Sequence, residues 1–479
     1  MIIRSIDAII RMLDADYIEN ADIEEKIQGV CIDSRKVVEG NLYIPIHGAN
    51  NNGHAYVQQA IDNGARAVLW ERREANPPKE IVVILVDDTT AALQQLAKAY
   101  RDQLNMKVVG VTGSNGKTST KDILASVLAK HFITQKTLGN YNNEIGVPLT
   151  LLSLSENCEA AVVEMGMENL QELSFLTQIV RPDIAIISNV GTAHLENLGT
   201  MENIARAKME ITEGLGEHGL LIYNGDQQLL RNAAIEKQIP GCIKIRTFGK
   251  DEQNDVVVHQ VRQLPDGLCF SIKDQVYHLD MIGKHQAMNA TAAWIAARAL
   301  GLDEEEIAQG FASVEKTGLR NELVRVNQCL ILNDSYKSNP QSALAAVDTM
   351  EEFDIPYKLA VLGDMLELGE TSDMIHYTLG KDISSYHLQE VLTIGDMACY
   401  IAQGARDNME HTMVRHFTDK EELLNYLRPY MHKECMLLVK GSRGMKLDEV
   451  VDELVKEQQL GVHIYGKDKI SDYIRRKVK

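Results

Sequence analysis

The chain has 479 residues, of which 45% are hydrophobic, and its formal net charge is −19. This length exceeds the capacity of one hydrophobic core and indicates a globular protein of roughly two to four domains. The negative charge argues against a nucleic-acid partner, because binding along a phosphate backbone requires a concentrated Lys and Arg surface.

The first residues do not predict a targeting segment. In MIIRSIDAIIRMLDADYIEN, Asp7 interrupts the apolar run too early for a signal peptide, and no later stretch has the about 18 uninterrupted apolar residues of a membrane span. The seven cysteines are scattered without a CxxC pair, which predicts neither a zinc site nor a disulfide framework. We therefore expect a cytoplasmic protein with no membrane partner.

Short apolar strands alternate with helical patterns along the chain, which predicts an α/β fold with parallel sheets. Residues 1–105 contain a strand, a polar loop, a helix and a strand, in GNLYIPIHGANNNGHAYVQQAIDNGARAVLW. Residues 106–318 contain the strand candidates KVVGVTG, AAVVEMG, DIAIISNVG and GLLIYNGD. Residues 319–479 contain CLILNDSY, YKLAVLGDM, EVLTIGD and CMLLVKGS, and end in GKDKISDYIRRKVK, a predicted solvated helix. Ligands of open sheets bind at the carboxyl ends of strands, so functional residues are expected there.

The segment VVGVTGSNGKTSTKDILASVLAK, residues 108–130, has the pattern of a strand, a glycine-containing turn and a helix. Gly113 and Gly116 allow a tight turn that points backbone N–H groups at an anion, and the helix adds its positive N-terminal end. Lys117 is placed to neutralise phosphate charge and the Thr118 hydroxyl to hold Mg²⁺. A strict Walker A motif has glycine where this chain has Val111, so a plain strand-to-helix turn is the alternative.

Polar residues also follow the next two predicted strands. Glu164 closes AAVVEMG, and we expect it to bind a metal beside the phosphate loop; the alternative is a surface carboxylate. His194 lies in NVGTAHLENLG and is a second candidate for metal binding or catalysis. A lone histidine is more commonly an ordinary loop residue, so that alternative stays open.

Several motifs resemble, in their order along the chain, those of the Mur ligases, the ATP-dependent amide-forming enzymes of bacterial cell-wall synthesis. They are GSNGKTS, VVEMG, SNVGTAHLE, ARAKMEI, GKHQAMNATAA, GLRNEL and NDSYKSNP. Three longer segments are similar to the family member that adds D-alanyl-D-alanine to UDP-N-acetylmuramoyl-tripeptide. These are TLGNYNNEIGVPLTLL (137–152), LGDMLELGE (362–370) and KGSRGMKLDEVV (440–451).

The resemblance implies a ligase of three domains. Residues 1–105 would form a smaller α/β domain for the UDP moiety, and residues 106–318 a central ATP-binding domain with a P-loop parallel sheet. Residues 319–479 would form a Rossmann-like domain that brings the incoming dipeptide. The implied cofactors are ATP and Mg²⁺, and the implied substrates are UDP-N-acetylmuramoyl-tripeptide and D-alanyl-D-alanine. We expect a monomer.

The resemblance also implies roles for single residues. The nucleotide would be bound by Gly113, Ser114, Asn115, Gly116, Lys117, Thr118, Ser119, Asn289 (adenine), Arg320 (phosphates) and Asp334 (ribose). The other substrate would contact Ser34, Arg35, Asn140, Asn142 and Asn143, and the loop from Gly48 to His54 would contact UDP. The alternatives are a solvated turn for Ser34 and Arg35, a turn cluster for the asparagines, a polar helix face for Asn289, and structural ion pairs for Arg320 and Asp334.

Lys208, in NIARAKMEI, has two interpretations. Its neighbours Arg206 and Glu210 are charged, which on sequence alone predicts a solvated helix lysine. The segment resembles the family position whose lysine reacts with CO₂ to form a carbamate, an anion that helps to hold a second Mg²⁺. That reaction needs a neutral amine, hence a desolvated or positively charged environment. The implied catalytic set is Lys117, His194 and Lys208, and the implied metal ligands are Thr118, Glu164, His194 and Lys208.

Two positions depart from the family pattern. Where relatives commonly have His-Asn before the adenine-binding asparagine, this chain has His285 and Gln286. Where they have Tyr-Asn-Ala-Asn-Pro, it has YKSNP, with Lys337 and Ser338. Lys337 is therefore expected to alter the adjoining nucleotide or acceptor pocket.

Two other functions stay open. The first is a sister amide ligase of Mur or folylpolyglutamate synthase type. It is disfavoured because the chain has no Asp-Asn-Pro or Asp-Asp-Pro acceptor motif, and because its phosphate loop reads Gly-Lys-Thr rather than Gly-Lys-Gly. The second is a P-loop kinase or regulatory NTPase, which would leave the N-terminal block and KGSRGMK unexplained.

Overall fold

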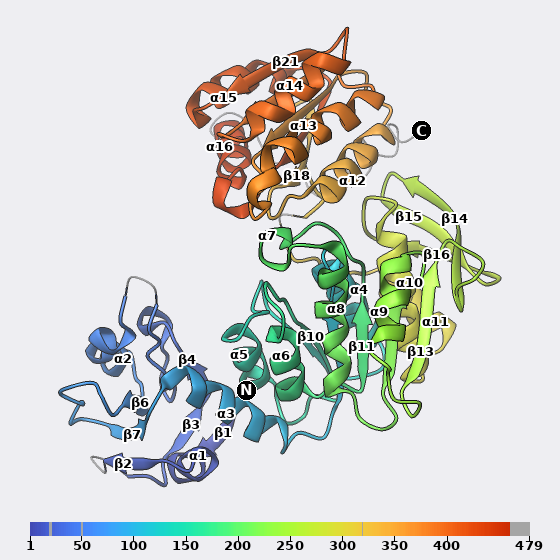
Figure 1. Ribbon diagram of the computed structural model, residues 1–479. Helices are drawn as coiled ribbons and strands as arrows, with labels where there is room; N and C mark the ends of the chain where they lie inside the picture. The colour runs from blue at the N-terminus through green and yellow to red at the C-terminus, as the bar shows by residue number, and fades with distance from the viewer. Residues whose placement is uncertain (19–21, 49–50, 319, 460–479) are drawn as a thin grey trace.

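The computed structural model describes residues 1–18, 22–48, 51–318 and 320–459. Three α/β domains follow one another along the chain, each built around a main sheet (Figure 1). The N-terminal domain, blue in Figure 1, and the C-terminal domain, orange to red, both adjoin the central domain and lie apart from each other. The predicted three-domain α/β fold is confirmed, while the boundaries after residues 105 and 318 stay predictions. The basic segment 466–479 lies outside the described residues.

The N-terminal sheet has the strand order β2-β7-β6-β5-β4, with β2 antiparallel to β7 and the other pairs parallel. Its strands are β2 (Asp16–Ile18), β4 (Val30–Cys31), β5 (Leu42–Tyr43), β6 (Ala67–Glu71) and β7 (Val82–Val86). A separate ribbon pairs β1 (Ile3–Ser5) with β3 (Lys26–Gln28). The helices are α1 (Ile6–Leu13), α2 (Val57–Asp62) and α3 (Thr89–Arg101). The predicted strand, helix and strand correspond to β5, α2 and β6.

The central sheet has the order β16-β15-β14-β13-β12-β11-β8-β10-β9. Its strands are β8 (Lys107–Thr112), β9 (Thr134–Lys136), β10 (Ala160–Glu164), β11 (Ile184–Ile187), β12 (Leu220–Asn224), β13 (Lys244–Gly249), β14 (Val256–Leu264), β15 (Gly267–Ile272) and β16 (Gln275–Leu279). In the spatial order from β9 through β10, β8, β11, β12 and β13 to β14, neighbouring strands are parallel. Strands β14, β15 and β16 form an antiparallel extension, which no sequence pattern predicted. The helices are α4 (Lys117–Leu128), α5 (Gly146–Ser153), α6 (Glu172–Val180), α7 (Leu195–Leu198), α8 (Met201–Met209), α9 (Gln228–Glu236), α10 (Gln286–Ala299) and α11 (Glu304–Phe311).

The C-terminal sheet has the order β17-β18-β22-β19-β20-β21, and β17 is its antiparallel edge strand. Its strands are β17 (Glu322–Val326), β18 (Cys329–Asp334), β19 (Lys358–Gly363), β20 (Glu390–Ile394), β21 (Met413–Phe417) and β22 (Cys435–Lys440). The helices are α12 (Pro340–Glu351), α13 (Ser372–Asp382), α14 (Ala398–Asn408), α15 (Lys420–Leu427) and α16 (Asp448–Gln459). Among the described residues, no helix is long and apolar enough to cross a membrane.

The hydrophobic cores do not follow the three domains one to one. One cluster of buried residues runs from Ile6 and Leu93 of the N-terminal domain into Leu151 and Ile187 of the central domain. A second cluster covers the opposite face of the central sheet. The C-terminal domain has its own clusters on both faces of its sheet. The N-terminal and central domains are therefore joined by continuous apolar packing.

Helix α4 is more deeply buried than its sequence predicts. Ile123, Val127 and Leu128 account for one apolar face of the helix, but the whole segment from Thr118 to Leu128 is buried. The reason is that α10 and α11 pack against α4 on the side away from the strands. The helix that follows the phosphate loop is consequently held on all sides.

Candidate active site

A cavity of about 760 Å³ lies between the carboxyl ends of the central strands and the C-terminal domain. Most of the predicted site residues line it: Ser114, Asn115, Gly116, Lys117, Thr118, Ser119, Asn140, Asn142, Asn143, Glu164, His194, Asn289, Arg320 and Asp334. Gly113 and Lys208 do not line the cavity but lie near Lys117. Ser34 and Arg35 belong to the N-terminal domain.

The two glycines of the phosphate loop are required by its geometry. Gly116 has a φ of 80°, and a Cβ there would lie 2.5 Å from Asn289 Oδ1. Gly113 has a φ of 148°, and a Cβ there would lie 1.9 Å from Ser188 Oγ. Both contacts are shorter than non-bonded atoms tolerate, so a side chain at either position would displace the loop. The strand-to-helix turn is thus built for close approach of its backbone to neighbouring groups.

Lys117 and the first turn of α4 form the positive end of this loop. Ser114 and Asn115 donate their backbone N–H groups to Asn189 O and Oδ1, which fixes the loop to the end of β11. The first residues of α4, whose amides have no partner within the helix, line the cavity. Lys117 Nζ donates to Gly113 O at 2.6 Å. Its side chain is partly buried in the wall of the cavity, and this burial, with the charge of Lys337, lowers the pKa of Lys117 to about 8.

Glu164 is a buried carboxylate, so its alternative interpretation as a surface carboxylate is wrong. It is 1% exposed at the end of β10. Its Oε2 accepts a hydrogen bond from Thr118 Oγ1 at 2.7 Å, and its Oε1 accepts one from Asn142 Nδ2 at 2.8 Å. Lys121 Nζ lies 3.8 Å from the same Oε2. A hydroxyl and a fixed carboxylate oxygen are therefore adjacent at the phosphate loop.

His194 immediately precedes the short helix α7 and has a φ of 64°, an unusual conformation for a residue other than glycine. It is 7% exposed, and burial lowers the pKa of His194. Its Nε2 lies 3.3 Å from Lys337 Nζ. Its Nδ1 lies 3.0 Å from Glu367 Oε2, an ion-pair distance without the alignment of a hydrogen bond. The contact with His194, followed by the charge of Lys337, lowers the pKa of Glu367 to about 2.

Lys208 is buried, so its interpretation as a solvated helix lysine is wrong. The residue is 1% exposed on the inner side of α8, whereas Arg206 points outward and pairs with Glu236. Desolvation, followed by the charges of Lys117 and Lys337, lowers the pKa of Lys208 well below its usual value. The amine is therefore in the kind of environment that carbamate formation requires.

The residues implied in binding adenosine and the phosphates line the same cavity. Asn289 is 6% exposed and donates through Nδ2 to Gln286 Oε1 at 2.8 Å. Gln286, which differs from the family pattern, therefore orients the side chain of Asn289. The Arg320 guanidinium lies 4.1 Å from the centre of the Tyr336 ring. Asp334 Oδ2 accepts from the buried Lys440 Nζ at 2.6 Å. The ion-pair alternative is thus realised for Asp334, whereas Arg320 stacks on an aromatic ring.

The asparagines after β9 differ in their local roles. Asn142 holds Glu164, as described above. Asn143 Oδ1 accepts the backbone N–H of Gly146 at 2.9 Å at the start of α5, which is a turn function. Asn140 lines the cavity beside them. The structure therefore combines the two interpretations, a turn cluster whose side chains also face the cavity.

Ser34 and Arg35 lie in the N-terminal domain and have different environments. Ser34 is 6% exposed and donates through Oγ to Gln59 Oε1 at 2.7 Å, so it is not a solvated turn residue. Arg35 is exposed and pairs with Asp33 Oδ1 at 2.8 Å. A contact of either residue with UDP stays a prediction.

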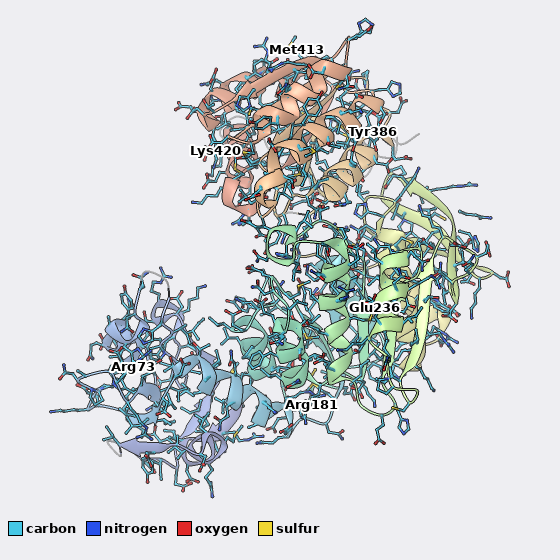
Figure 2. The ribbon with its side chains drawn as sticks, in the orientation of Figure 1. Arg73, Arg181, Glu236, Tyr386, Met413 and Lys420 are labelled. Carbon is cyan, nitrogen blue, oxygen red and sulfur yellow. The ribbon has the colours of Figure 1, made fainter. Side chains whose placement is uncertain are left out.

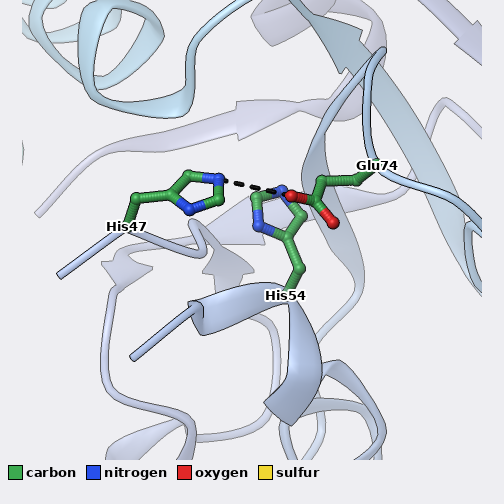
Figure 3. A group of neighbouring side chains, drawn as sticks. All are labelled: His47, His54 and Glu74. Carbon is green, nitrogen blue, oxygen red and sulfur yellow. Dashed lines mark ion pairs between the residues drawn. The ribbon is translucent and has the colours of Figure 1, made fainter. Parts of the chain in front are cut away.

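The loop from Gly48 to His54 has two residues, 49 and 50, outside the described ones. His54 is 4% exposed, with Nδ1 2.8 Å from Asn52 Oδ1 and Nε2 accepting the Glu71 N–H at 3.3 Å. His47 Nε2 lies 3.5 Å from Glu74 Oε1, and these side chains converge in Figure 3. Because both ring nitrogens of His54 have protein partners, His54 anchors the loop to β6 rather than offering a free ligand atom.

Several cavity residues were not predicted as site residues. Glu168, which follows strand β10, lines the cavity, and Glu367, in LGDMLELGE, lies 3.0 Å from the cavity residue His194. Lys337, which was expected to alter the adjoining nucleotide or acceptor pocket, lines the cavity, as do Tyr336 and Lys440, which no motif indicated. Except for Glu168, these residues approach the site from the C-terminal domain, so no pattern near the phosphate loop predicts them.

Comparison with known proteins gives matches along most of the chain. Residues 26–101 match the model of the Mur ligase family, catalytic domain, residues 111–297 the Mur ligase middle domain, and residues 319–443 the Mur ligase, glutamate ligase domain. UDP-N-acetylmuramoyl-tripeptide--D-alanyl-D-alanine ligase of Bacillus subtilis (strain 168) is 42% identical over 95% of this chain and 99% of that protein.

Solved structures agree with this result. A crystal structure of MurF from Acinetobacter baumannii has a TM-score of 0.85 and 29% identity, covering 95% of this chain and 99% of that one. MurF ligase from Thermotoga maritima in complex with ADP has a TM-score of 0.78 and 28% identity, covering 91% and 99%. The fold and site define a three-domain α/β protein with a phosphate loop facing its C-terminal domain. The chain belongs to the Mur ligase family.

Proposed function

We propose that this chain is an ATP-dependent ligase that joins D-alanyl-D-alanine to UDP-N-acetylmuramoyl-tripeptide in peptidoglycan precursor synthesis. The observation that carries the proposal is the cavity of about 760 Å³, where the phosphate loop, Glu164 and His194 meet Arg320 and Asp334 at the C-terminal domain. A nucleotide and a second substrate held by different domains can react at such an interface. The 42% identity to the Bacillus subtilis ligase along nearly the whole length of both chains supports this choice of substrates.

The chemistry follows from the weakness of a carboxylate as an acyl donor, because its leaving group would be oxide. The tripeptide carboxylate attacks the γ-phosphate of ATP, the bond to the bridging oxygen breaks, and ADP leaves as the acyl phosphate forms. The amine of D-alanyl-D-alanine then attacks the carbonyl carbon, and phosphate leaves. Lys117 and the amides at the start of α4 stabilise the charge on the transferred phosphoryl group by fixed electrostatics.

The donor set at the phosphate loop fits Mg²⁺. Thr118 Oγ1 and Glu164 Oε2, 2.7 Å apart, are oxygen donors of the kind that Mg²⁺ prefers, and Glu164 is held by Asn142. His194 and Lys208, the latter as a carbamate, would hold a second ion. When bound, these ions neutralise phosphate oxygens and offset repulsion between ATP and the substrate carboxylate.

Alanine variants of two of these residues test the metal assignment. Glu164→Ala and His194→Ala are each expected to raise the Mg²⁺ concentration needed for half-maximal rate, because each removes one ligand. The measurement is the ligation rate as a function of Mg²⁺, with melting temperature recorded in parallel. Unchanged Mg²⁺ dependence at unaltered stability would assign both residues to structure.

The proposed function itself is tested by phosphate release. We expect release from ATP to require both UDP-N-acetylmuramoyl-tripeptide and D-alanyl-D-alanine. Release with a single amino acid instead of the dipeptide would indicate a sister amide ligase. Release without any amine would indicate a kinase or regulatory NTPase. The lack of an Asp-Asn-Pro or Asp-Asp-Pro acceptor motif favours the dipeptide ligase.

We place the reaction in the cytoplasm, where ATP and UDP-linked precursors are available, and the acting form as a monomer. The N-terminal domain would bind the UDP moiety through Ser34, Arg35 and the loop from Gly48 to His54. Asn140, Asn142 and Asn143 would lie along the path from that domain to the cavity, since they line the cavity and offer amide groups to sugar and phosphate oxygens.

A further inference from the structure

Lys337 brings a positive charge from the C-terminal domain into the cavity. It lies in the loop between β18 and α12, and its Nζ is 3.3 Å from His194 Nε2 and 3.6 Å from Glu367 Oε2. Its backbone carbonyl accepts a hydrogen bond at 2.9 Å from Lys440 Nζ, which also pairs with Asp334 at 2.6 Å. The buried Lys440 thus fixes the base of the loop that carries the ammonium group.

The ammonium group sits among side chains that are typical metal ligands. Glu168, His194 and Glu367 each offer one ligand atom, and these atoms all lie within 4.8 Å of one another. Two carboxylates and an imidazole form a donor set suited to a divalent ion. Lys337 contacts two of the three residues, so the position that such an ion would take is close to its Nζ.

Hydrogen-bond chemistry determines which atom of His194 is engaged. A lysine ammonium group can only donate, so His194 Nε2 is the acceptor in its contact with Lys337. A metal ion binds an imidazole through the same unprotonated nitrogen. Lys337 and a metal therefore compete for Nε2, and repulsion between two cations a few ångströms apart excludes both from the site together.

We propose that Lys337 is a tethered cation that fills the cation position between Glu168, His194 and Glu367, so that a divalent ion reaches His194 only by displacing it. The contact also joins the domains, because Lys337 and Glu367 come from the C-terminal domain while Glu168 and His194 come from the central one. The consequence for catalysis rests on the proposed function: once a divalent ion has displaced Lys337, its ammonium group is free to face the ATP phosphates.

The test is a titration of the full-length, nucleotide-free protein with Mn²⁺. The electron paramagnetic resonance signal of free Mn²⁺ measures how much of the ion is bound. Lys337→Met and Lys337→Asn, which both remove the ammonium group, are expected to bind one Mn²⁺ at least about tenfold more tightly than the unchanged protein. Adding His194→Ala to Lys337→Met is expected to abolish the gain. Equal affinity in the unchanged protein and both single variants, or a gain that survives His194→Ala, would overturn the proposal.

Lys420→Met is the matched control. Lys420 is also partly exposed and also paired, with Glu449 at 2.8 Å, and Figure 2 places it on the outer surface of the C-terminal domain. We expect the Mn²⁺ affinity of Lys420→Met to equal that of the unchanged protein. If Lys420→Met gained as much affinity as Lys337→Met, loss of any positive charge would explain the gain, and the proposal would be overturned. Because no nucleotide is present, failure of this test is distinct from failure of the ligation assay, which tests the proposed function.

Discussion

Replacing Lys117 by alanine is expected to lower the ligation rate by about 10²- to 10³-fold, the usual cost of removing one preorganised charge donor. Lys117 is held at the mouth of the phosphate loop by its bond to Gly113 O, where no other lysine of the loop can replace it. Binding of UDP-N-acetylmuramoyl-tripeptide is expected to persist, because the UDP moiety is assigned to another domain. Steady-state phosphate release and calorimetric titration of the UDP substrate measure the two effects separately.

Lys107→Ala serves as the control for this variant. Lys107 lies at the opposite end of β8, is 58% exposed, and is 3.5 Å from Asp183, so its loss leaves the cavity unchanged. A Lys117→Ala protein with near-normal turnover would contradict the nucleotide assignment, whereas loss of UDP-substrate binding would show that the two sites are not independent.

Replacing Lys208 by alanine is expected to abolish most ligase activity, and acetate is expected to restore part of it. The reason is that the carbamate of Lys208 would supply an anion at the second metal position, and a small carboxylate can enter the space that the side chain vacates. Burial lowers the pKa of Lys208 and so favours the neutral amine, the form that attacks CO₂ to give the carbamate and release a proton. Ligation rates with and without acetate measure this effect.

A second measurement separates carbamate formation from a positional role. Protein equilibrated with ¹³C-labelled bicarbonate is expected to show a carbamate carbon resonance that disappears in Lys208→Ala. Arg206→Ala is the control, because Arg206 lies on the same helix but pairs with Glu236 on the solvent side. Full activity of Lys208→Ala would rule the role out, and loss without acetate rescue or a carbamate resonance would leave Lys208 a structural residue.

The fold was predictable where strands are apolar on both faces. Strands β8, β10, β11 and β12 are continuous apolar runs buried between helices, and each was expected. The extension β14 to β16 was missed because β14 mixes buried and exposed residues over its nine positions, with His259 and Gln260 exposed at a bulge. Such a strand lacks the uninterrupted apolar run by which the others were found.

The site was predictable where one short segment fixes the geometry. The phosphate loop was predictable because its short motif contains Gly113 and Gly116. Both glycines adopt positive φ values, which other residues avoid. The contact of Lys337 with His194 joins residues 143 positions apart, and only the packing of two domains brings them together. The burial of Lys208 could not be predicted from its charged neighbours, because Arg206 on the same helix faces solvent whereas Lys208 and Glu210 are both buried.

The apolar cluster that runs from Ile6 through Leu93 to Ile187 makes the first two domains one cooperative unit in unfolding. Melting of the N-terminal domain would uncover the apolar sides of α5 and α6, against which α3 packs, so we expect the two domains to lose structure together. The clusters of the C-terminal domain consist almost entirely of its own residues, with Ile282 of the central domain packed against one of them, so this domain depends far less on the other two. Calorimetry of the nucleotide-free protein should accordingly resolve two heat-absorption peaks rather than three, and a chain ended before β17 should still fold.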